Sequence, residues 1–173
     1  MTEARISSET VFAGKLLRVR VDRVELPSGR IGVREVVEHP GAVAILPVMD
    51  DGTLVLVRQF RYAVGRGLLE TPAGTREPGE DPRETAIREL REEVGFEAGS
   101  VEPLVRFFIS PGWCNEELIA YRATGLREVG AAPEMDEQIE IVRVSVEDVP
   151  ELIASGEICD AKTITAIFAH LRG

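Results

Sequence analysis

Residues 74–96 read GTREPGEDPRETAIRELREEVGF, and more of the fold and chemistry can be inferred from this stretch than from any other part of the chain. It begins with a loop rich in glycine and proline, which favours a turn. A helix should follow, because Asp81 is a favourable N-cap residue and Pro82 suits the first helical position. Gly95 occupies the place of a left-handed C-cap residue, so the sequence predicts that the helix ends there.

The predicted helix has an apolar face and an acidic face. Its apolar residues recur at helical spacing and should form a buried stripe of Ile87, Leu90 and Val94. Glu89 and Glu93 are four residues apart and share one face, with Glu92 at its edge. Carboxylates concentrated in this way repel one another unless a cation neutralises them, and carboxylate oxygens are the ligands that Mg²⁺ and Mn²⁺ prefer.

The acidic helix has two interpretations. It could be an ordinary solvated surface helix, or it could bind a divalent metal. The preceding glycine loop and its acidic residue, Glu80, favour the metal site. Arg88 faces a different direction from the acidic face, and we expect it to bind Glu80 in the loop rather than a substrate.

The spacing of these residues resembles the Nudix box. Gly74 is followed after five residues by Glu80, and after seven more by the run RELREEVGF, which ends at Phe96. The resemblance implies an α/β fold, the Nudix α/β/α sandwich around a mixed sheet, and hydrolysis of nucleoside diphosphates linked to another moiety. It also implies two or three Mg²⁺ ions per site, with Mn²⁺ possible, and the metal ligands Glu89, Glu93 and Glu92. The box residues expected to act structurally are Gly74, Glu80, Arg88 and Gly95.

Three segments beside the box resemble the ADP-ribose pyrophosphatase branch of this family. They are LETPAG at 69–74, SPGWCNE at 110–116 and VRQFRY at 57–62. In this branch the carbonyl of Ala73 would be a further metal ligand. The resemblance implies cleavage of ADP-ribose to AMP and ribose 5-phosphate, with substrate-binding residues Arg61, Arg58, Glu70, Pro111, Gly112 and Glu116. Arg61 is the first candidate for the nucleotide end, because a guanidinium pairs well with phosphate.

The water nucleophile requires a general base, and we expect the acidic loop at 133–140 to supply it, because metals should occupy the box carboxylates. In related ADP-ribose pyrophosphatases a glutamate of the corresponding loop has this role, and alignment on the strand at Ile139 indicates Glu137. Glu134 and Glu140 are the alternatives, and the loop could also be merely solvated.

The rest of the chain predicts a mixed sheet between helices. Alternating or continuous apolar runs indicate strands at 16–24, 33–38, 41–49, 53–60, 101–109, 118–124 and 139–146, and helical spacing indicates helices at 149–155 and 161–171. We expect residues 1–38 to be an antiparallel β extension and residues 39–173 to be the Nudix hydrolase domain. The resemblance implies a homodimer formed through the N-terminal sheet.

Composition limits the class of protein. The 173 residues are 44% hydrophobic and 29% charged, as in globular proteins, and the net charge of −10 argues against a nucleic-acid polymer as partner. No apolar run is long enough for a membrane span and no signal peptide is evident, so the expected location is the cytoplasm. The alternatives left open are another Nudix substrate, such as a nucleotide sugar or FAD, and a non-catalytic sensor of ADP-ribose.

Overall fold

The computed structural model describes residues 2–131 and 138–172, and they form two compact units. The N-terminal unit comprises Met1–Gly41 and Phe108–Glu117. The main unit comprises Ala42–Phe107 and Leu118–Gly173. The segment from Phe108 to Glu117 therefore groups with the N-terminal residues, although it lies far from them in the sequence.

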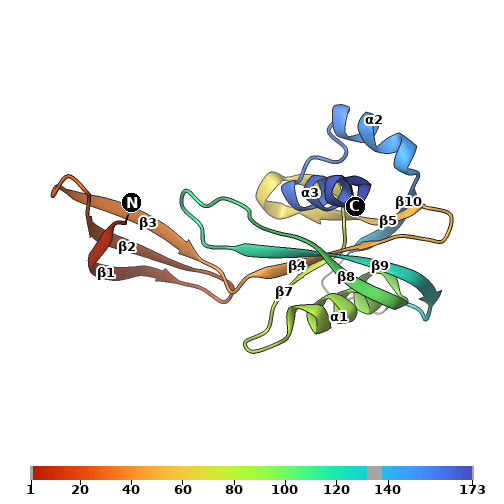
Figure 1. Cartoon of the computed structure of the whole chain (residues 1–173), viewed down its shortest axis with the longest axis horizontal. Coiled ribbons are helices and arrows are strands. Elements are labelled where there is room, and N and C mark those ends of the chain that lie inside the picture. Colours follow the sequence, from red (N-terminus) through yellow and green to blue (C-terminus); the bar gives the residue numbers. More distant parts are fainter. Residues whose placement is uncertain (1, 132–137, 173) are drawn as a thin grey trace. The chain divides into compact units, whose positions relative to one another are not determined.

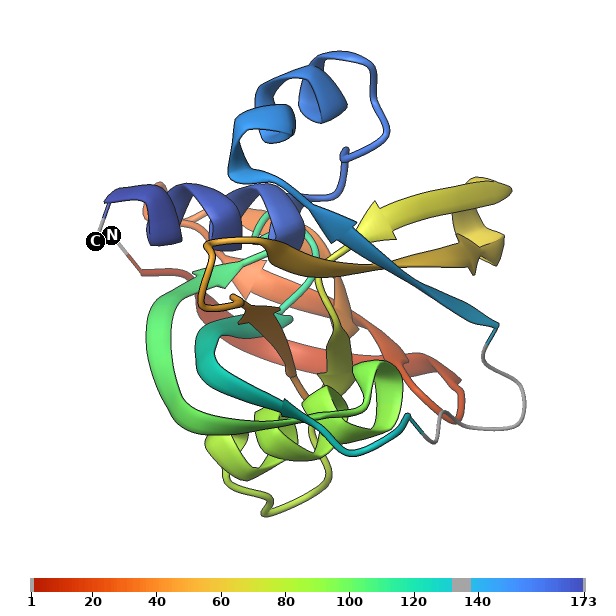
Figure 2. The same cartoon turned by 90° about the vertical axis from the view of Figure 1, so that its right-hand side faces the viewer.

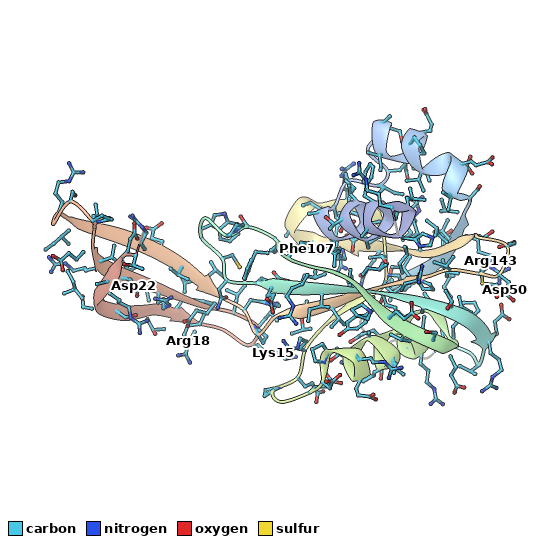
Figure 3. The ribbon with its side chains drawn as sticks, in the orientation of Figure 1. Lys15, Arg18, Asp22, Asp50, Phe107 and Arg143 are labelled. Carbon is cyan, nitrogen blue, oxygen red and sulfur yellow. The ribbon has the colours of Figure 1, made fainter. Side chains whose placement is uncertain are left out.

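The N-terminal unit contains an antiparallel sheet in the order β1-β2-β3, with bounds Ala4–Ala13, Arg18–Glu25 and Ile31–Glu38 (Figure 1). The sequence predicted β2 and β3 but not β1, whose pairing with β2 is interrupted by two register shifts. Asp22 lies on β2 (Figure 3). Its side chain is buried and pairs with Arg20. The segment Phe108–Glu117 is hydrogen-bonded to β3, because the N–H of Val37 donates to the carbonyl of Trp113 at 2.8 Å.

The main unit contains two sheets rather than the single mixed sheet that the sequence predicted. One has the order β7-β4-β9-β8 and the other β10-β5-β6. β4 pairs parallel with β9 and antiparallel with β7. The strands are β4 (Ala42–Pro47), β5 (Leu54–Arg61), β6 (Arg66–Glu70), β7 (Ala73–Thr75), β8 (Phe96–Phe108), β9 (Glu117–Glu128) and β10 (Ile139–Val144).

The helices of this unit pack on opposite sides of β4. They are α1 (Pro82–Val94), α2 (Val149–Ala154) and α3 (Ala161–Arg172), with short 3₁₀ turns η1 (Tyr62–Val64) and η2 (Val146–Asp148). Val43 and Ile45 share a core with Leu90 of α1, whereas Ala44 shares another core with Ile167 of α3. Figures 1 and 2 show α1 and α3 on the two sides of the central strands. β4 is thus buried on both faces, and the predicted α/β/α layering is confirmed.

Two strands beside the box, β6 and β7, were not predicted. β7 has only three residues, Ala73–Thr75, and two of them are too small to show an alternating pattern. The turn at Asp50–Gly52 does form, with Met49 N–H donating to Thr53 O at 2.8 Å, but it joins strands of different sheets. Within the described ranges, the model contains no helix of the length and apolar character that a membrane span requires.

Candidate active site

The box helix α1 begins and ends at the predicted residues. The Asp81 carboxylate accepts a hydrogen bond from the backbone N–H of Arg83 at 2.9 Å. At the other end Gly95 has φ of 72°, and its N–H donates to the carbonyl of Arg91 at 3.1 Å. The capped helix holds Glu89 and Glu93 inward, with exposed fractions of only 8% and 3%, and Glu92 is partly buried.

The two inward carboxylates lie against the backbone of β7. Oε2 of Glu93 accepts a hydrogen bond from the N–H of Ala73 at 3.1 Å. At Gly74 a Cβ atom would lie 2.7 Å from Cγ of Glu89 and would overlap its carboxylate group. Gly74 is therefore required by close approach, because any side chain there would displace Glu89.

Arg88 connects the loop to the acidic face. Its Nε atom lies 3.2 Å from Oε1 of Glu80, which is the pairing that the sequence suggested. Its Nη1 atom also lies 2.7 Å from Oε1 of Glu89 and 2.9 Å from Oε2 of Glu92. Burial alone would lower the pKa of Arg88, but the hydrogen bonds and charges of these three carboxylates raise it above its ordinary value. Arg88 therefore neutralises part of the acidic face as well as anchoring the loop.

The donors of this face suit a hard divalent cation, although the side chains have not converged around one. No group of three or more His, Cys, Asp or Glu side chains in residues 2–131 and 138–172 is arranged to hold a metal ion. Glu89 and Glu93 are nevertheless carboxylates buried by more than nine-tenths, and charges buried so deeply normally have an ion pair or a metal as partner. The backbone of Ala73 adjoins Glu93, and Glu92 is turned toward Arg88. That these four residues ligate metal stays a prediction.

A second charged cluster surrounds Glu70, the last residue of β6. Glu70 is 1% exposed, and its Oε2 atom accepts hydrogen bonds from Nη2 of Arg61 and Nζ of Lys162, both at 2.6 Å. Nζ of Lys162 also donates to Oδ1 of Asp160 at 3.0 Å. Burial alone would raise the pKa of Glu70, but its hydrogen bonds and charge interactions with Arg61 and Lys162 lower it overall.

The sequence indicated Arg61 and Glu70 but not Lys162 or Asp160. Lys162 lies in the first turn of α3 and Asp160 immediately precedes this helix; Lys162 contacts both Asp160 and a glutamate 92 positions earlier in the chain. No local pattern marks a contact of that separation. The nearest signal is composition, because Lys162 is one of only two lysines in the sequence, the other being Lys15.

The two arginines of β5 have different surroundings. Arg61 lies at the end of β5 and belongs to the Glu70 cluster. Burial alone would lower the pKa of Arg61, but its hydrogen bond to Glu70 and the charges of Glu70, Glu93 and Asp160 raise it overall. Arg58 instead pairs with Glu157, with Nη1 2.7 Å from Oε2, and lies opposite Glu140 of β10 in the sheet register. The structure therefore separates Arg58 from the residues around Glu70.

The remaining candidates, apart from Glu140, lie outside the main unit or outside the described residues. Pro111 and Gly112 are exposed in the N-terminal unit, and Glu116 is 3.8 Å from Nδ1 of His39 in the same unit. Of the possible bases, Glu134 and Glu137 lie outside the described residues. Glu140 is exposed on β10.

Comparison with known proteins identifies relatives along the whole chain. A family model described as NUDIX domain matches residues 38–166, and one described as nucleoside diphosphate sugar hydrolase N-terminal domain matches residues 3–37. The chain is 41% identical to an ADP-ribose pyrophosphatase of Bacillus subtilis, over 96% of this chain and 91% of that protein. It is 39% identical to a methanol dehydrogenase activator of Bacillus methanolicus, over 95% and 90% of the two chains.

A solved structure extends this similarity to the fold. The crystal structure of an ADP compounds hydrolase superposes with a TM-score of 0.88 at 26% identity, and the match covers 99% of this chain and 94% of that chain.

Proposed function

We propose, because the chain belongs to the NUDIX family, that it hydrolyses the diphosphate bond of ADP-ribose to AMP and ribose 5-phosphate. One observation supports this most directly. Arg61, a cation suited to phosphate, is hydrogen-bonded to Glu70, three residues before Ala73, whose N–H donates to Glu93 on the proposed metal-binding face of the box helix. A diphosphate bound there would have a guanidinium on one side and the box carboxylates on the other. The similarity to the Bacillus subtilis ADP-ribose pyrophosphatase and to the ADP compounds hydrolase supports an adenosine diphosphate derivative as substrate.

The roles that we propose for the individual site residues follow from these positions. Glu89 and Glu93 would hold divalent cations, assisted by Glu92 and the carbonyl of Ala73. Such cations neutralise the diphosphate charge and promote ionisation of the attacking water. Arg61 would orient the diphosphate, and Arg88 would keep the acidic helix attached to the loop at Glu80.

A glutamate from the loop that follows β9 would remove the proton of the attacking water. Glu137 is the first candidate for this base, with Glu134 and Glu140 as alternatives. A base outside the box is needed because Glu89 and Glu93 are the proposed metal ligands.

We further propose that residues 1–38 form a dimerisation element and residues 39–173 a hydrolase domain in a cytoplasmic homodimer. β1 is an edge strand in which every residue is exposed. Several large apolar side chains of this sheet are also exposed, among them Ile6, Phe12, Ile31 and Val33. Edge strands with such a surface are usually covered, and a second copy would cover this one.

A substrate panel tests the proposed reaction. The purified chain would be incubated with Mg²⁺ and ADP-ribose, GDP-mannose or FAD, and products separated by ion-exchange chromatography. We expect the highest kcat/KM for ADP-ribose, with AMP and ribose 5-phosphate in equal amounts. A higher kcat/KM for GDP-mannose or FAD would reassign the substrate, and binding of ADP-ribose without turnover of any substrate would favour a sensor.

A further inference from the structure

Two cations, Arg61 and Lys162, share a single oxygen of the buried Glu70. Oε2 accepts from Nη2 and Nε of Arg61, at 2.6 and 3.0 Å, and from Nζ of Lys162 at 2.6 Å. Glu70 carries one negative charge and is almost completely buried. Lys162 also pairs with Asp160 at 3.0 Å, so the cluster balances two carboxylates with two cations, and what matters is which cation can leave Glu70.

The two cations differ in how firmly they are held. The side chain of Lys162 is 14% exposed, and that of Arg61 is 38% exposed. Lys162 also contacts Asp160, whose Oδ1 accepts the backbone N–H of Thr163 at 3.1 Å. Thr163 in turn accepts, through Oγ1, the N–H of Thr71 at 2.8 Å, which ties the start of α3 to the residue after Glu70. Lys162 is therefore the fixed partner of Glu70, and Arg61 is the exchangeable one.

This difference between Lys162 and Arg61 matters when a phosphate group of the substrate competes with Glu70 for Arg61. If the guanidinium moved from the buried carboxylate to a ligand, the carboxylate would remain as an unpaired buried charge, which is strongly unfavourable. Nζ of Lys162 lies 2.6 Å from Oε2 of Glu70, so Glu70 would still have a cation as partner if Arg61 turned away. We propose that Lys162 is a positioning residue that neutralises Glu70 and so frees the guanidinium of Arg61 to bind the diphosphate of the substrate. This inference rests on the proposed function, because it assumes a diphosphate substrate beside the box.

Removing Lys162 should hold Arg61 on Glu70. The cluster would then contain the carboxylates of Glu70 and Asp160 and one cation, Arg61, which would have to stay. Substrate binding would weaken because the guanidinium of Arg61, the proposed anion-binding group, would remain on Glu70. If Glu70 is also made neutral, the negative charge at position 70 that holds Arg61 is gone, and binding should recover. A purely structural role for Lys162 predicts the opposite, since a second change in the cluster would add further damage.

The test is a double-mutant cycle with K162M, E70Q and K162M/E70Q. KM and kcat are measured with ADP-ribose and Mg²⁺, and the Kd of ADP is measured calorimetrically in EDTA, where no metal contributes. We expect K162M to raise KM and the Kd of ADP by about tenfold with a smaller change in kcat. We expect K162M/E70Q to bind ADP more tightly than K162M. Lys15, the other lysine, is exposed, and K15M should bind ADP like the wild type.

Several outcomes would overturn the inference. One is a K162M/E70Q protein that binds ADP as weakly as K162M or more weakly. Another is K162M with unchanged Kd. If K162M does not fold, K162R and K162Q replace it: K162R, which keeps the cation, should bind ADP within about threefold of the wild type, and K162Q should not. Equal binding by the two overturns the inference. A wild type that binds ADP but does not cleave ADP-ribose would overturn the proposed function alone, because the ADP cycle still tests Lys162.

Discussion

Gly74 and Glu89 are in such close approach that the backbone of β7 and the acidic face of α1 leave no space for a side chain. A Cβ atom at position 74 would lie 2.7 Å from Cγ of Glu89 and would overlap its carboxylate. We therefore expect G74A to turn Glu89 away from its position and to lower kcat/KM for ADP-ribose by about 100-fold, comparable to losing a metal-supporting group. Steady-state kinetics at several Mg²⁺ concentrations would measure this, and the Mg²⁺ requirement should rise.

Gly67 on β6 provides the control for this change. A Cβ there would meet its nearest neighbours only at 4.0 Å, which is ordinary van der Waals contact. G67A should keep kcat/KM within about threefold of the wild type, as expected of an accommodated surface change. Equal losses of kcat/KM in G67A and G74A would show that the close approach of residue 74 to Glu89 is not the cause of the lower activity of G74A.

Replacing Glu93 by glutamine tests the proposed metal ligands and can keep the hydrogen bond from Ala73. Its Oε2 accepts from Ala73 N–H, and the amide oxygen of a glutamine can still accept. E93Q should therefore keep the thermal midpoint within a few degrees and lower kcat by more than about 100-fold. Manganese binding followed by electron paramagnetic resonance should weaken in parallel. E84Q, an exposed change on the same helix, is the control, and wild-type turnover in E93Q would remove Glu93 from the metal site.

Local sequence signals were sufficient for the helices and for most strands. The caps of α1 at Asp81 and Gly95 and the doubly buried strand β4 are each encoded in a few adjacent residues, and the structure contains all of them. The same is true of the Glu80–Arg88 pair, because both partners belong to one motif. Such features are determined by propensity and spacing, which a single sequence displays directly.

Features that depend on long-range pairing could not be predicted in this way. β7 is a strand because β4 pairs with it, since its three residues show no periodicity of their own. Lys162 meets Glu70 because α3 packs beside β4, which no spacing in the sequence reveals. The same limit explains why one sheet was predicted where the strands β4 and β5 belong to two, although the turn between them was recognised.

The three candidate bases can be separated by single changes. E137Q should lower kcat by about 10²- to 10⁴-fold with little change in KM, because a general base acts in the transition state rather than in binding. E134Q and E140Q serve as controls and should each retain most of the activity. A large loss in E134Q or E140Q, with E137Q nearly unaffected, would transfer the role to that residue. The kcat–pH profile of E137Q should also lose its acidic limb, which reports the base.

The proposed dimer can be tested on β1. Phe12 is 54% exposed on this edge strand, and a charge there would oppose burial against a second copy. We expect the wild type to sediment as a dimer and F12E to shift toward the monomer, with the Kd of dimerisation raised at least about tenfold. Val64, an equally exposed apolar residue of the main unit, supplies the control V64E. A wild type that sediments as a monomer at micromolar concentration would exclude the dimer.

Gly95 both caps α1 and is hydrogen-bonded to the residues that directly follow β9. Its carbonyl accepts the N–H of Val129 at 2.8 Å and of Gly130 at 3.2 Å, and a Cβ at 95 would lie 2.7 Å from the carbonyl carbon of Gly130. Gly156 has a similar φ of 80° but open space around it. G156A should therefore cost only the left-handed strain, about 1 kcal/mol, whereas G95A should cost about 1–3 kcal/mol more from steric overlap. Urea unfolding measures the difference. Equal effects of the two changes would show that only the φ angle matters.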